Sequence, residues 1–134
     1  MRRPFVWISL VLTWVVLAGL VVQLYLIAAY IFGAGGALDA HKTIGGVVVH
    51  PAEVLVFLVS IAAWWRVWRN IGLSFALALT GTIQVFFAGD VGGKHGYLHG
   101  LHGGLVLVVA WIAWLIARRE WRALGLGRTA APAA

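Results

Sequence analysis

The chain has 134 residues, of which 63% are hydrophobic and only 10% are charged, so it has too few polar residues to cover a soluble domain. Its net charge of +6 comes from short basic clusters between long apolar runs, which indicates topology signals and no nucleic-acid partner. The absence of cysteine excludes disulfides, thiolate metal sites, iron–sulfur clusters and covalently attached c-type haem. We therefore expect a protein whose principal partner is the lipid bilayer.

Four apolar runs are long enough to cross a bilayer, because its ~30 Å hydrocarbon core requires roughly 20 helical residues. The expected helices span residues 5–33, 41–65, 71–89 and 97–117. They predict an all-α fold, an integral membrane four-helix bundle with up-down-up-down topology. Residues 1–122 would form this single domain, and the Ala-rich residues 123–134 would form a flexible cytoplasmic tail.

Basic and aromatic residues predict how the helices are oriented in the membrane. The positive-inside rule places both termini and the middle connection in the cytoplasm, because arginines cluster only there. These arginines are Arg2, Arg3, Arg66, Arg69, Arg118, Arg119 and Arg122. Tryptophans near the same helix ends, expected to be interfacial anchors, are Trp64, Trp65, Trp68 and Trp121.

Two short stretches share one pattern, a histidine four residues ahead of a glycine pair and an aliphatic run. They are HKTIGGVVV from His41 and HGLHGGLVLVV from His99. A glutamine precedes each histidine, Gln23 by 18 residues and Gln84 by 15, so the repeat is weak. Such a repeat predicts two parallel helix pairs related by an axis along the membrane normal. His41 and His99 would then lie on diagonal helices, where two imidazoles can hold a planar ligand between them.

Imidazole is the best metal ligand that this chain offers, and ionisable groups in membrane helices indicate functional sites. We therefore expect His41 and His99 to be metal ligands, with hydrogen-bonded structural roles as the alternative. His41 could also mark a helix start with Asp39 as its N-cap. His102 lies about 60° around the helix from His99 and ~4.5 Å deeper in the membrane. It is therefore the alternative metal ligand if His99 is not one. A solvated loop role is expected for His95.

Gly45 and Gly103 each lie one turn below a candidate ligand, on about the same helical face. They either clear space for a cofactor or only let two helices pack closely. His50 is nine residues from His41 and would point to the opposite face of an ideal helix, so a shared pocket needs a distortion, which Pro51 could supply. His50 could instead pair with Glu53, either to carry protons or as a structural contact.

The segments DAHKTIGGVVVH and LHGLHGGLVL resemble an uncharacterised family of small bacterial four-helix membrane proteins, over most of the chain. This resemblance implies a multi-pass protein of the bacterial inner membrane. More distantly, the layout is similar to one half of haem A synthase, in which histidines at the outer ends of the second and fourth helices flank haem. That resemblance implies cofactor roles for His41 and His99 and places Gln84 in a similar setting. It does not extend to the glutamate three residues before the first histidine, since position 38 is Leu38.

Small b-type membrane cytochromes are similar in using two histidines on such bundles. The sequence therefore favours a haem b-binding protein for electron transfer or haem handling, with His50 and His102 as a weaker second set. One alternative is a non-enzymatic subunit or scaffold of a larger membrane complex. Another is a metal or proton carrier with an outer mouth formed by His95, His99, His102 and Asp90. No hydrolase or transferase motif occurs, so no catalytic residue is assigned, and a quinone is a possible partner.

Overall fold

The structure is a computed structural model that describes residues 2–88 and 97–127. These residues are helical throughout apart from short connections and contain no strand. The elements are α1 (Arg3–Ile31), α2 (Ala37–Ile44), the π-helical turn η1 (Gly45–Val49), α3 (His50–Ala63), α4 (Trp68–Ala88) and α5 (Tyr97–Ala123). Because α2, η1 and α3 follow one another without a break, they form one continuous helical arm, which we call the second span. Four helical spans are thus long and apolar enough to cross a membrane, which confirms the all-α membrane fold.

The helix ends differ from the expected ones for local reasons. The second span begins at Ala37, because Gly33 and Gly36 adopt positive φ angles of 88° and 77° and form the preceding turn. The prediction that Asp39 is the N-cap is wrong, since Gly36 holds that position and no side chain caps the helix. The last helix continues to Ala123, beyond the expected end at residue 117, and its final turns contain the fully buried Glu120.

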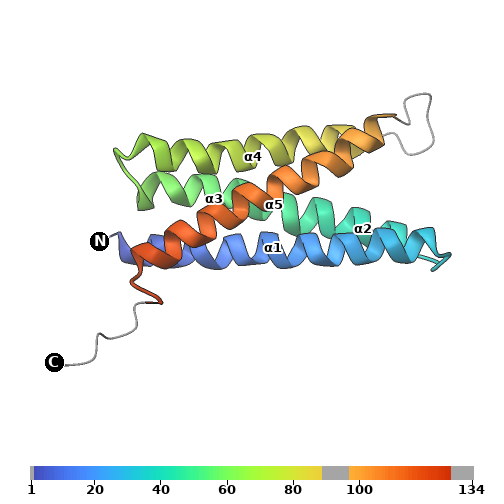
Figure 1. Cartoon of the computed structure of the whole chain (residues 1–134), viewed down its shortest axis with the longest axis horizontal. Coiled ribbons are helices and arrows are strands. Elements are labelled where there is room, and N and C mark those ends of the chain that lie inside the picture. Colours follow the sequence, from blue (N-terminus) through green and yellow to red (C-terminus); the bar gives the residue numbers. More distant parts are fainter. Residues whose placement is uncertain (1, 89–96, 128–134) are drawn as a thin grey trace.

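The four spans pack as a bundle in which each contacts two neighbours. The contacting pairs are α1 with α3, α3 with α4, α4 with α5, and α5 with α1. The second and fourth spans are therefore diagonal partners, as are α1 and α4. Figure 1 shows α5 running obliquely across the other helices.

The two ends of the bundle carry different chemistry. The N-terminus, the α3–α4 connection and the end of α5 lie together at one end (Figure 1). All seven arginines expected to mark one side of the membrane belong to these segments, so we call this the arginine end. The turn between α1 and α2 and the beginning of α5 lie at the opposite end, which we call the histidine end.

Apolar side chains fill the bundle between its two ends. The main buried cluster draws on every span, and its members are Val16, Leu20, Val49, Ala52, Val56, Leu77, Val109, Ala113 and Ile116. A smaller cluster at the arginine end contains Val6, Leu10, Ala63, Ala117 and Leu124. These small and branched side chains allow close helix packing, which is the main stabilising contact between helices in lipid.

A π-helical turn interrupts the second span. In η1, the backbone N–H of His50 donates to the carbonyl oxygen of Gly45, five residues earlier, in place of the usual four. Pro51 follows at the beginning of α3, where a residue without a backbone N–H is tolerated. The distortion expected near Pro51 is therefore present, and it changes the helical face on which His50 lies relative to His41.

Candidate functional site

A reciprocal pair of hydrogen bonds ties the first two spans together at the histidine end. The amide Nε2 of Gln23, in α1, donates to the backbone carbonyl of His41, in α2, at 2.8 Å. In return, Nδ1 of His41 lies 3.1 Å from the backbone carbonyl of Gln23. In both bonds the acceptor is a backbone carbonyl of a helix, a group that normally accepts only from its own helix. The two bonds fix His41 in position against α1.

The last two spans repeat half of this arrangement. Nδ1 of His102, in α5, lies 3.1 Å from the backbone carbonyl of Gln84, in α4. The histidine and the glutamine are again 18 residues apart, the separation found between Gln23 and His41. The partner of His41 in the internal repeat is therefore His102, and the unequal spacing found with His99 disappears.

The same register extends through the buried faces of α1 and α4. Thr13 Oγ1 donates to the carbonyl of Ser9, four residues earlier, and Ser74 Oγ donates to the carbonyl of Asn70 in the same way. Asn70 and Ser74 lie 61 positions after Ser9 and Thr13, respectively. The same separation lies between His41 and His102. The two helix pairs thus share polar positions along their length, although their sequences have little else in common.

The two repeated histidines face each other across the bundle. The ring centroids of His41 and His102 are 6.4 Å apart, and the ring planes meet at 80°. Because a carbonyl oxygen can only accept, Nδ1 carries the proton in each ring, and in a neutral imidazole Nε2 then carries the lone pair. Among the described residues, no hydrogen bond engages Nε2 of His41. The site therefore brings together two imidazoles from diagonal spans.

The two candidate glycines have different surroundings. A methyl group on Gly45 would lie 2.6 Å from Nε2 of Gln23, so this glycine makes room for the amide that holds His41. A methyl group on Gly103 would meet nothing within 4 Å, and the same holds for Gly46 and Gly104. Gly45 thus serves close packing, whereas the glycines that follow His102 are exposed at the surface of the bundle.

Three other expected site residues have side chains that lie outside the described residues. His99 belongs to α5, but its side chain lies outside the described residues, as do His95 and Asp90. No group of three or more histidine and carboxylate side chains within the described ranges could hold a metal ion by itself. A cofactor that brings its own equatorial ligands requires only two from the protein, and His41 with His102 supply that number.

His50 forms a separate site deeper in the bundle. Its Nδ1 lies 3.2 Å from Oε2 of Glu53, which confirms the expected pairing. Glu53 is 1% exposed, and its carboxyl group lies directly against Gly81 of α4. The other oxygen, Oε1, has no hydrogen-bond partner in the described part of the chain. A buried carboxyl group with one open oxygen in an apolar bundle is a polar site in its own right.

A polar network at the arginine end was not predicted from the sequence. Glu120 Oε1 accepts from Ser9 Oγ at 2.9 Å, from the Trp64 indole at 3.0 Å and from the Arg119 guanidinium. Arg119 also donates to the backbone carbonyl of Asn70 at 2.7 Å and stacks over Trp64. Trp64 is therefore partly an internal residue and not only the interfacial anchor expected. The one signal in the sequence was an acidic residue within a run of arginines.

Comparisons with protein-family models, with curated proteins and with solved structures found no match to this chain. The resemblance to one half of haem A synthase therefore stays a prediction. What the site can do follows from the geometry and chemistry of its residues.

Proposed function

We propose that the chain is a membrane haem b protein in which His41 and His102 would hold the haem iron. The observation that carries this proposal is the pair of facing imidazoles, 6.4 Å apart between centroids, each with Nδ1 bonded to a backbone carbonyl. His102 replaces His99 in the expected ligand pair, because its side chain lies opposite His41.

The ring separation agrees with shared ligation of one metal ion. With metal–nitrogen bonds of about 2.0–2.1 Å, two imidazoles on opposite sides of one ion have ring centres roughly 6 Å apart. A backbone carbonyl on Nδ1 is also the usual outer contact of a metal-binding histidine, because it orients the ring and leaves Nε2 for the metal. Both histidines have this contact, and they receive it from equivalent residues of the repeat.

Two buried polar atoms occupy equivalent positions of the repeat. The carbonyl oxygens of the Gln23 and Gln84 side chains are buried without hydrogen-bond partners among the described residues, so each could accept from a donor group of a ligand. Gly46, Gly103 and Gly104 are exposed at the surface of the bundle, where an added methyl group would meet nothing within 4 Å. His41 and His102 would hold the haem, and the chemistry that haem held by two histidines would supply is one-electron transfer. Haem handling is the alternative use of the same site.

We further propose up-down-up-down spans with both termini in the cytoplasm of a bacterial cell. The support is that the arginines gather at one end of the bundle, which the positive-inside rule assigns to the cytoplasm. The histidine site then lies in the outer half of the inner membrane. A quinone or a larger membrane complex would be the electron partner.

The test is a reduced-minus-oxidised visible spectrum of the purified full-length protein, produced with haem in excess. We expect b-type bands that are lost in His41→Ala and in His102→Ala. His50→Ala is the matched control, because His50 bonds to Glu53 and not to the facing pair, and it should keep the bands. His99→Ala tests the ligand that was expected from the sequence. Because we propose His102 in its place, we expect this variant to retain the b-type bands.

A second candidate function is a non-enzymatic transmembrane subunit or scaffold. The observation that favours it is that His41, His50 and His102 all bond to groups of the chain itself. A colourless protein under haem excess, with wild-type folding of the histidine variants, would exclude the haem proposal and favour the scaffold.

A further inference from the structure

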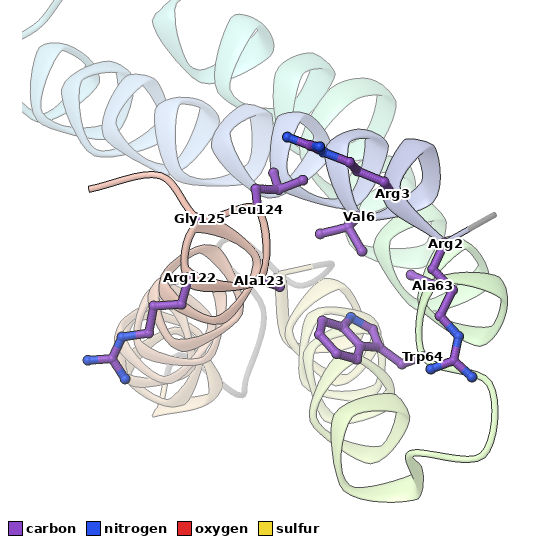
Figure 2. A pocket seen from close by; sticks show the side chains of 9 residues that line it. All are labelled: Arg2, Arg3, Val6, Ala63, Trp64, Arg122, Ala123, Leu124 and Gly125. Atoms are coloured by element: carbon purple, nitrogen blue, oxygen red, sulfur yellow. The ribbon is translucent and has the colours of Figure 1, made fainter. Parts of the chain in front are cut away.

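A cavity of about 520 Å³ opens at the arginine end of the bundle. It lies between the beginning of α1, the end of α3 and the end of α5 (Figure 2). Val6, Ala63, Trp64 and Leu124 form its inner walls, and none of the described residues that line it is acidic. The cavity lies far along the bundle from the histidine pair, so what it binds is independent of the proposed haem.

Three arginines stand at the rim of the cavity. Arg2, Arg3 and Arg122 line it, and Figure 2 shows their side chains extending outward from it in different directions. All three are exposed, and Arg2 also donates to the backbone carbonyl of Trp65 at 3.2 Å. Long, exposed arginine side chains can turn over a group that enters between them.

The described residues do not balance the positive charge of this rim. Within the described ranges the only ion pairs are His50 with Glu53 and Arg119 with Glu120, so none of the three rim arginines has a carboxylate partner. Glu120 is the only described acidic residue at this end, and it is fully buried by Ser9, Trp64 and Arg119. An anion from outside the chain is therefore the expected counter-charge.

We propose that this cavity binds a phosphate group, the chemistry shared by anionic lipid headgroups and soluble phosphates. Guanidinium groups bind phosphate oxygens through paired N–H donors. Basic pockets between membrane helices on the cytoplasmic side are suited to anionic headgroups. The apolar walls formed by Val6, Ala63 and Leu124 also suit the glycerol and first acyl carbons of a lipid.

The experiment is native mass spectrometry of the purified full-length protein with dioleoyl phosphatidylglycerol, with dioleoyl phosphatidylcholine and with inorganic phosphate. The variants are Arg122→Gln and the double variant Arg2→Gln/Arg3→Gln. Arg69→Gln is the matched control, because Arg69 is an exposed arginine at the same end that does not line the cavity. We expect the wild-type protein to retain phosphatidylglycerol over phosphatidylcholine, with about fivefold weaker binding for each guanidinium removed from the rim.

The three probes separate the two sources of phosphate. Retention of phosphatidylglycerol that inorganic phosphate does not displace assigns the site to a lipid headgroup. Binding of inorganic phosphate alone, weakened by the same rim variants, assigns it to a soluble phosphate. Equal affinity of the wild-type protein, the rim variants and Arg69→Gln for every probe would overturn the proposal. Circular dichroism of each variant checks that a loss of binding does not come from unfolding.

Discussion

The carboxyl group of Glu53 occupies the space that any side chain at position 81 would need. A methyl group built on Gly81 overlaps both the Oε2 atom and the carboxyl carbon of Glu53. Gly81 is buried in α4 and Glu53 is buried in α3, so the glycine is what lets the two helices close around a polar group. The acid and the glycine form one unit, and a change to either disturbs the packing of both helices.

We therefore expect Gly81→Ala to lower the stability of the bundle by about 1–3 kcal/mol, as overpacking of a closed interior does. Gly72→Ala is the control on the same helix, because an added methyl group there meets nothing within 4 Å. Thermal unfolding in detergent, followed by circular dichroism, measures both variants. Equal midpoints for the two variants would show that Glu53 can move aside without cost.

A second prediction concerns the glycine that holds the Gln23 amide. Gly45→Ala should push Nε2 of Gln23 from the carbonyl of His41, because the added methyl group would lie 2.6 Å from that nitrogen. We expect a loss of about 1–3 kcal/mol in the same unfolding assay. Gly46→Ala is the neighbouring control and should be neutral or stabilising, since its methyl group enters open space and alanine favours helix. Similar losses in both variants would contradict the role given to Gly45.

A third prediction concerns where the histidine protons lie. His41 and His102 should both carry the proton on Nδ1 when neutral, since each Nδ1 faces a backbone carbonyl that can only accept. Nitrogen NMR of the full-length protein labelled with ¹⁵N-histidine, at pH 8 and without added haem, reports the protonated ring nitrogen. The variants His41→Ala and His102→Ala assign the signals. A proton on Nε2 of either ring would remove the electron pair that the proposed ligation requires.

A fourth prediction concerns the buried carboxylate at the arginine end. Glu120→Ala leaves the Arg119 guanidinium without its partner in the bundle interior, which typically costs about 3–5 kcal/mol. The double variant Arg119→Met/Glu120→Leu should be much less harmful, because it removes both charges together. Ser9→Ala should cost only about 1 kcal/mol, since Glu120 keeps its other two donors. Thermal unfolding of the four proteins forms the comparison, and a double variant as unstable as Glu120→Ala would contradict it.

The four spans could be predicted from the sequence because each is a long apolar run, a feature that does not depend on its neighbours. The pairing of His50 with Glu53 could also be predicted, since residues three apart share a helical face. The helix ends were less accurate, because they depend on Gly33 and Gly36 and on the burial of Glu120. Local composition does not reveal such tertiary effects.

The contacts of His102 with His41 and Gln84 could not be predicted from the sequence. Aligning HKTIGG with HGLHGG on their glycine pairs matched His41 with His99. The two glycines have different surroundings, however, because Gly45 packs on Gln23 and an added methyl group on Gly103 would meet nothing within 4 Å. The useful regularity was the equal separation of glutamine and histidine, which gains its meaning only from the contact between neighbouring helices. The network around Glu120 was missed because its members come from three helices and are distant in sequence.

The wide turn at Gly45–Val49 makes the second span behave as two helices in different rotational phase. The part before this turn directs His41 toward α1 and α5, and the part after it directs Glu53 toward α4. One residue fewer in this segment would remove the wide turn and leave an ordinary α-helix, with the helical faces on either side nearly unchanged. A single deletion here should therefore be tolerated better than a deletion elsewhere in the span, which would turn the following residues by about 100°.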